Sequence, residues 1–239
     1  MREKMLRTTQ IYSLLGCFLL LMVVGSAQAF LIDSFNDTFQ IVLKAAPGPV
    51  TSATAAGEAV GDFRTMEMLS VAGPLGATLA AHIGDALSLS NDALTSSMSI
   101  VIWDASGAGL GGVDLTDVGT SSFVILDILS IDIGGVDIEM TITDTGGDVA
   151  TKLISGAGAG VFEVLFADFV NFTATDFTSV DAITMKLTAD EASDLVLDFV
   201  ATSGAIPEPS SLVLLGMGIL GVVGYGWRRR KKVLPNNSL

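Results

Sequence analysis

The sequence predicts an all-β fold, an antiparallel β-sandwich of two packed sheets. Residues 136–143 alternate strictly between apolar and polar side chains, and the same period recurs in 98–103, 183–187 and 194–199. A strand with this period buries one face and leaves the other in water. Turn-forming glycines and aspartates separate the runs, and few stretches keep a helical period of about 3.6 residues.

Shorter runs complete the predicted strands. They lie at 39–43, 63–69, 86–89, 123–128 and 161–166, which makes about nine strands in all. Residues 76–86 favour a short helix, and residues 45–61, rich in Ala, Gly, Pro and Thr, predict a long loop. Residues 144–148, Asp-Thr-Gly-Gly-Asp, predict a turn between two strands.

The N-terminal end predicts export. Three basic residues precede the apolar run 11–24, and Ala27 and Ala29 supply the small side chains that signal peptidase requires. We therefore expect residues 1–29 to be a signal peptide, cleaved before Phe30.

The C-terminal end has three parts in a fixed order. The motif Pro207, Glu208, Pro209 is followed by an 18-residue segment, 210–227, which is apolar from Leu212 to Trp227, and then by a basic cluster. A helix of about 18 residues spans about 27 Å, enough for a thin bilayer core. We expect one transmembrane helix, with residues 233–239 as a cytoplasmic tail. The basic cluster that stops the helix consists of Arg228, Arg229, Arg230, Lys231 and Lys232.

This order of parts resembles the PEP-CTERM sorting signal of Gram-negative bacteria, in which Pro-Glu-Pro is recognised by the membrane protease-transpeptidase exosortase. The resemblance covers residues 206–232 only. It implies a precursor in the inner membrane, processing by exosortase at Pro207-Glu208-Pro209, and delivery to the outer envelope or the extracellular polysaccharide. The alternative is a plain C-terminal membrane anchor without processing.

Residues 30–205 remain as one domain, long enough to bury a core. Twenty-four acidic residues lie there against four basic ones, which gives a net charge of about −20. This charge disfavours nucleic acid and anionic lipid and favours divalent cations or cation-bridged polysaccharide, although solubility alone could account for it. The single cysteine, Cys17, lies in the expected signal peptide, so the mature domain has no disulfide.

A second resemblance concerns this domain. The segments 31–35, 60–64, 109–116 and 176–183 are similar to parts of other ectodomains that carry the same C-terminal signal. Those ectodomains resemble jelly-roll, galactose-binding-like sandwiches. The resemblance implies a fold and a location, and it names no ligand.

Two features that could indicate catalysis have simpler interpretations. Residues 107–112 fit Gly-x-Gly-x-x-Gly, but no helix begins after them, so a flexible hairpin loop is a better interpretation than a dinucleotide site. His82 is the only histidine, which disfavours a Ser-His-Asp site and a His-rich zinc site.

A carboxylate pair is the basis of the alternative function, an envelope polysaccharide hydrolase. The candidates are the glutamates of the domain, Glu58, Glu67, Glu139, Glu163 and Glu191. Such enzymes normally surround the pair with aromatic rings. The domain has one tryptophan, Trp103, and no tyrosine, since Tyr12 and Tyr225 lie in the targeting segments. The same scarcity disfavours a stacking type of sugar site. We therefore expect that the protein is not an enzyme.

Aspartates at the expected strand ends are candidate ligands for a structural calcium ion, because loop carbonyls can complete an oxygen cage there. The alternative is that these side chains bond the backbone of their own turns without a metal. The candidate ligands are Asp33, Asp37, Asp114 and Asp117, and the other aspartates at strand ends are Asp104, Asp144 and Asp148.

These observations predict an exported β-sandwich protein with signal peptidase and exosortase as processing partners. Its expected role is structural or adhesive, in exopolysaccharide or biofilm, with polysaccharide as the candidate ligand. A calcium-dependent binding module overlaps with this role, and the hydrolase is the alternative.

Overall fold

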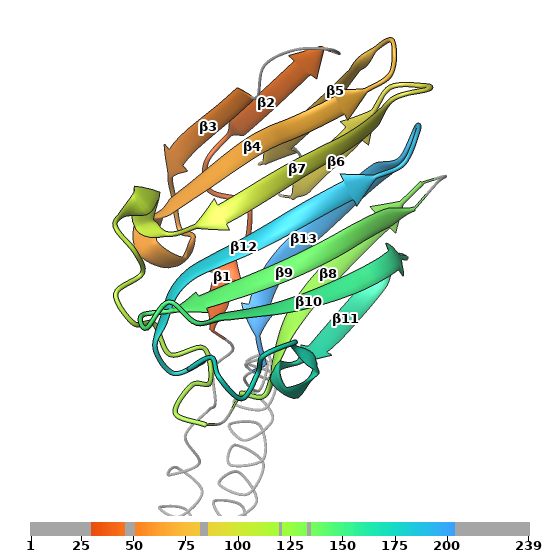
Figure 1. Ribbon diagram of the computed structural model, residues 1–239. Coiled ribbons are helices and arrows are strands. Elements are labelled where there is room, and N and C mark those ends of the chain that lie inside the picture. Colours follow the sequence, from red (N-terminus) through yellow and green to blue (C-terminus); the bar gives the residue numbers. More distant parts are fainter. Residues whose placement is uncertain (1–29, 46–50, 82–85, 120, 133–134, 204–239) are drawn as a thin grey trace, which may run out of the picture. The chain divides into compact units, whose positions relative to one another are not determined.

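The alternating runs of the sequence form two antiparallel sheets. The computed structural model describes residues 30–45, 51–81, 86–119, 121–132 and 135–203. Thirteen strands and three single-turn 3-10 helices lie in these ranges. Residues Ala29–Gly204 group as one compact unit. The predicted all-β class is confirmed, and the two sheets are the two layers of ribbon in Figure 1.

Sheet A, the first layer, has seven strands in the order β11-β8-β13-β6-β5-β2, with β1 paired to β13 outside this path. All its pairings are antiparallel. Its strands are β1 (Leu31–Asp33), β2 (Gln40–Ala45), β5 (Gly76–Ala81), β6 (Leu87–Asn91), β8 (Phe123–Ile131), β11 (Gly160–Leu165) and β13 (Asp194–Thr202).

Sheet B, the second layer, has six strands in the order β10-β9-β12-β7-β4-β3, again all antiparallel. Its strands are β3 (Thr51–Ala56), β4 (Phe63–Ala72), β7 (Ser96–Trp103), β9 (Val136–Asp144), β10 (Val149–Ala157) and β12 (Val180–Ala189).

The core lies between the inner faces of the two sheets. Every second residue of β9 is buried, beginning with Val136 and including Ile138 and Met140, while the residues between them are partly exposed. Large side chains such as Leu126 and Met66 fill the space from both sheets. Burying each such side chain contributes about 1.5–3 kcal/mol, so the alternation supplies most of the driving force for folding.

Two predicted elements are wrong. The segment 76–86 contains strand β5, because Ala77 and Leu79 face the core and the strand pairs with β2 on one side and β6 on the other. The predicted loop 45–61 contains strand β3, which pairs with β4, and the 3-10 helix η1 (Val60–Asp62). In both segments tertiary pairing overrides the weak local preference of alanine and glycine.

Residues 107–112 do not form a hairpin loop. Strand β7 belongs to sheet B and β8 to sheet A, so the segment between them crosses from one layer to the other after the 3-10 helix η2 (Ala105–Gly107). Gly109 has a φ of +82°, and a Cβ there would lie 2.4 Å from Asp181 Oδ1. The positive φ favours glycine, and a Cβ would also displace the Asp181 carboxylate.

The predicted turn at 144–148 is confirmed as the hairpin between β9 and β10. Asp144 Oδ1 accepts hydrogen bonds from the backbone N–H groups of Gly146 and Asp148, at 2.8 and 3.0 Å. The third 3-10 helix, η3 (Phe166–Asp168), follows β11, and its Phe166 ring lies 4.7 Å from the ring of Phe177.

Within the described ranges, no helix is long and apolar enough to cross a bilayer. The expected signal peptide, 1–29, and the expected transmembrane helix, 210–227, lie outside the described residues.

Candidate functional site

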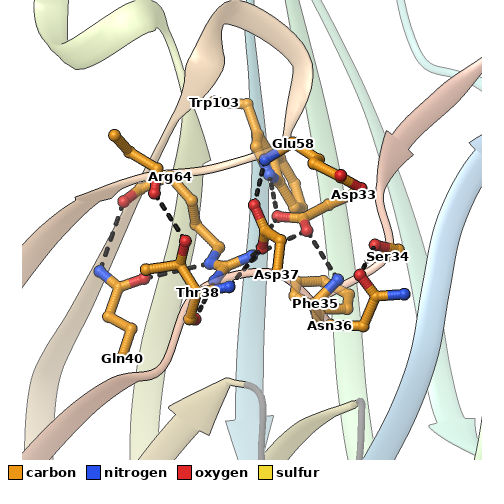
Figure 2. A network of polar contacts seen from close by, with 11 residues as sticks. Asp33, Ser34, Phe35, Asn36, Asp37, Thr38, Gln40, Glu58, Arg64 and Trp103 are labelled. Atoms are coloured by element: carbon orange, nitrogen blue, oxygen red, sulfur yellow. Dashed lines mark hydrogen bonds and ion pairs between the residues drawn. The ribbon is translucent and has the colours of Figure 1, made fainter.

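The strongest polar cluster lies where β1, β4 and β7 meet (Figure 2). Arg64 Nη1 donates to Asp33 Oδ1 and Oδ2, at 2.7 and 2.8 Å. Trp103 Nε1 donates to Asp33 Oδ2 at 2.7 Å. All three residues are at most 2% exposed. The result is a buried ion pair that ties the first strand of sheet A to two strands of sheet B.

The rest of the Arg64 guanidinium is also satisfied. Its Nε donates to Gln40 Oε1 at 3.1 Å, and Nη2 donates to the carbonyl of Thr38 at 3.2 Å. The Phe35 ring lies 5.3 Å from the guanidinium carbon, a cation–π distance, and Phe35 N donates to Asp33 Oδ1 at 2.8 Å. A charge pair that is buried and fully bonded in this way is a structural unit, since removing one partner leaves the other uncompensated.

Asp37 lies at the outer side of this cluster. Its Oδ1 accepts from the backbone N–H of Thr38 at 2.7 Å and lies 4.0 Å from Arg64 Nη1. Its Oδ2 accepts from the backbone N–H of Glu58. The structure therefore brings the predicted calcium ligands Asp33 and Asp37 to the same arginine, and a calcium ion there would compete with Arg64 for their oxygens.

Asp114 and Asp117, the other predicted calcium ligands, lie in the crossover from β7 to β8. Asp114 Oδ1 accepts from the backbone N–H and the hydroxyl of Thr116, at 2.8 and 2.6 Å, and Oδ2 accepts from Val118 N at 3.0 Å. Burial raises the pKa of Asp114, but the hydrogen bonds from Thr116 and Val118 outweigh it and hold the pKa below its ordinary value. This is the geometry of an aspartate that bonds its own turn.

Asp144 has a similar role at the end of β9. The backbone N–H of Asp176 donates to its Oδ2 at 2.8 Å and is the largest cause of its lowered pKa. Burial opposes this shift, and the turn N–H groups of Asp148, Gly146 and Gly147 reinforce it. In the described part of the chain, no group of three or more His, Cys, Asp or Glu side chains is placed to hold a metal ion. Calcium binding remains a prediction.

Glu67, Glu139 and Glu163, three of the candidate hydrolase carboxylates, do not lie on neighbouring strands. Glu139 lies on β9 of sheet B and Glu163 on β11 of sheet A. Lys186 Nζ donates to Glu139 Oε2 at 2.9 Å. Glu67 points outward on the same sheet as Glu139, but β12 and β7 stand between them, so the two are about 14 Å apart at about 4.8 Å per strand. Glycosidase pairs are separated by about 5–9 Å.

The sequence reasoning missed the cluster around Arg64. A signal was present, because Arg64 shares the parity of Met66 and Met68 in its strand and so had to face the core. Other predicted residues lie outside the described ranges, and the structure places none of them. These are His82, Ala27, Ala29, Pro207, Glu208, Pro209, Arg228, Arg229, Arg230, Lys231 and Lys232.

The sandwich is similar to several solved structures, at low identity. The family 11 carbohydrate-binding module of the Clostridium thermocellum cellulase Lic26A-Cel5E is 11% identical, with a TM-score of 0.39 over 77% of this chain and 99% of that one. The family 30 module of cellulase Cel9D-Cel44B from the same organism is 14% identical, with a TM-score of 0.38 over 73% and 97%. The xyloglucanase domain of NopAA from Sinorhizobium fredii is 8% identical, with a TM-score of 0.40 over 68% and 98%. At these values the similarities say nothing about ligand or activity.

No curated protein has a significantly similar sequence over this chain. One family does match part of it. Residues 205–231 match the PEP-CTERM protein-sorting motif, and this match contains Pro207, Glu208 and Pro209. The chain therefore carries a PEP-CTERM protein-sorting motif, which indicates an exported protein.

Proposed function

We propose that this chain is the precursor of an exported envelope protein, that exosortase processes it at Pro207-Glu208-Pro209, and that the sandwich acts as a structural and binding module in exopolysaccharide. The match of residues 205–231 to the sorting motif is the observation that supports the proposal. The mature protein resides in the outer envelope or the extracellular matrix.

The ends of the sandwich suit a cargo that is processed at both termini. Strands β1 and β13 pair antiparallel, with Leu31 opposite Ala201, and Thr202 N donates to the carbonyl of Phe30 at 2.8 Å. The expected signal peptidase site, before Phe30, therefore adjoins the last strand. Three residues separate Ser203 from Pro207, and the four steps along the chain span at most about 14 Å. Both cuts fall outside the paired strands, so neither removes a core residue.

The placement of the carboxylates supports a role in binding without turnover. Glu139 is paired with Lys186, and Glu163 lies on the other sheet. Acid–base cleavage of a glycosidic bond requires two carboxyl groups on either side of that bond. Glu139 therefore forms no such pair with Glu163 or with Glu67.

The experiment is the intact mass of the protein recovered from its own envelope, together with a Glu208→Ala variant. The wild-type protein should begin at Phe30 and lack the basic cluster 228–232, and the variant should stay in the inner membrane at precursor mass. Finding the 228–232 peptide in the surface-exposed wild-type pool would contradict processing. A mature protein that washes freely from the matrix would contradict the binding role.

A further inference from the structure

Five threonines and one isoleucine stand in register across all six strands of sheet B. Thr151 of β10 is paired with Thr141 of β9, and Thr141 is paired with Thr184 of β12. The line continues through Ile102 of β7 to Thr65 of β4 and Thr54 of β3. These six residues, Thr151, Thr141, Thr184, Ile102, Thr65 and Thr54, are called the threonine row.

The threonine row lies on the outer face of the sandwich. On the four inner strands the neighbours of its members are buried: Met140 and Ile142 flank Thr141, and Ile183 and Met185 flank Thr184. Thr54 is exposed and the other five residues of the row are partly exposed. Five strand spacings of about 4.8 Å make the row about 24 Å long, so an extended polymer that crosses the strands can contact all six residues.

The hydroxyl groups of the row are available to a ligand. Thr54 Oγ1 and Thr65 Oγ1 bond each other at 2.9 Å. Within the described part of the chain, the hydroxyls of Thr141, Thr151 and Thr184 have no protein partner. Each hydroxyl can donate one hydrogen bond and accept two, and the β-branched side chain restricts its direction. Donors and acceptors thus repeat along a rigid line, beside methyl groups and the Ile102 side chain.

The charge around the row selects the class of polymer. The row itself has no ionisable residue, although the domain carries a net charge of about −20. In the next line of outward residues, Lys186 Nζ lies 2.9 Å from Glu139 Oε2, so these two charges largely cancel. Glu67 is the other charge in that line. An anionic polymer would be repelled by this surface, whereas a neutral polyhydroxylated polymer exchanges hydrogen bonds with water for hydrogen bonds with threonine at little cost.

We propose that the threonine row binds an extended neutral polysaccharide that lies across the strands of sheet B. The inference rests on the proposed function, for which it names the surface and the ligand class. Two exposed apolar side chains at the β10 end, Val149 and Leu153, can contact the C–H face of the sugar beside Thr151. Because the row lacks an aromatic platform, each binding event is weak, and affinity comes from the repeated contacts along the polymer.

The test is native affinity electrophoresis of the processed protein recovered from its envelope. The gels contain hydroxyethyl cellulose, dextran or galactomannan as neutral probes, alginate as an anionic probe, or exopolysaccharide from the host. The test variant combines Thr141→Val with Thr184→Val, which removes two hydroxyls and keeps the shape and strand preference. The control is Thr188→Val, on the same strand and the same face as Thr184 but four residues along.

We expect at least one neutral probe to retard the wild-type and control proteins, with affinity about tenfold weaker in the double variant. Retardation that the double variant retains in full, or retardation by alginate alone, would overturn the threonine row and leave the proposed function standing. The absence of retardation by every probe, the host exopolysaccharide included, would overturn both the threonine row and the polysaccharide-binding part of the proposed function, but not the processing by exosortase. Unfolding curves that coincide for the variant and the wild type exclude misfolding as the cause of a loss.

Discussion

Replacing Arg64 by methionine tests whether the buried ion pair holds the sandwich together. The change removes both hydrogen bonds that Arg64 donates to Asp33 and leaves that carboxylate 1% exposed without its cation. It also leaves Gln40 Oε1 without the donor at 3.1 Å. Breaking a buried pair from one side costs about 3–5 kcal/mol, a large part of the 5–15 kcal/mol or so that stabilises a typical domain.

The effect is large enough to measure by thermal unfolding. For a domain of this size, about 3–5 kcal/mol lowers the melting temperature by roughly 6–20 °C. The matched control is Lys186→Met, because the Lys186–Glu139 bridge has a similar length, 2.9 Å, but its side chains are 31% and 33% exposed. Removing an exposed pair costs at most about 1 kcal/mol. Both variants can be followed by circular dichroism on the processed protein.

A double variant separates the charge pair from simple loss of packing. Arg64→Met combined with Asp33→Leu removes both charges, so its cost should fall below the sum of the two single changes by as much as about 3 kcal/mol. Trp103 Nε1 then loses its acceptor, which keeps the double variant below wild-type stability. The reasoning is refuted if Arg64→Met costs no more than Lys186→Met, or if the two single changes are additive.

Three further predictions concern acidic residues. The pKa of Asp144 is lowered in the folded state, so its contribution to the free energy of unfolding is present above the unfolded pKa of about 4 and is lost as the pH falls through the folded pKa. Asp144→Asn should therefore destabilise the protein at pH 7 and much less below pH 4. Urea unfolding at a series of pH values measures the difference. If calcium binds at Asp114 and Asp117, millimolar calcium should raise the melting temperature more than magnesium at equal ionic strength, and Asp114→Asn with Asp117→Asn should remove the difference; equal shifts would leave only screening. We expect no release of reducing sugar from polysaccharide by the wild type, by Glu139→Gln or by Glu163→Gln. Hydrolysis by the wild type that either substitution abolishes would show that the protein is an enzyme.

The strands that the sequence predicts most clearly are those in which buried and partly exposed residues alternate over a long run. The alternation is unbroken in β9, and in β12 from Ile183 onward, and both strands lie between other strands of sheet B. Strand β10 was missed because its alternation is weak, since Thr151, Lys152 and Ile154 are all partly exposed. Strand β1 has only three residues, too few for any period.

The sequence alone predicts sites that are contiguous in the chain, and it misses sites whose residues are distant in the sequence. The sorting motif is a contiguous segment, so the sequence alone predicted it, and residues 205–231 match that family. The ion pair joins residues 31 positions apart, and Trp103 lies 70 positions from Asp33, so local pattern could not bring them together. The threonine row depends on the register of five strand pairs, and a shift of one residue in any of them would turn a threonine inward.

Because Phe30 and Thr202 are adjacent, the chain enters and leaves the sandwich at the same place. Paired residues such as Leu31 and Ala201 have Cα atoms about 4.5–5.5 Å apart, a gap that a few linker residues can close. A short linker could thus join Ser203 to Phe30, and new ends could be opened in the exposed turn at Gly146 and Gly147. Such a circular permutant would keep all the strand pairings and would lose only the chain connection between β9 and β10. By the same geometry, the whole unit can be inserted into a surface loop of another exported protein without stretching the host chain.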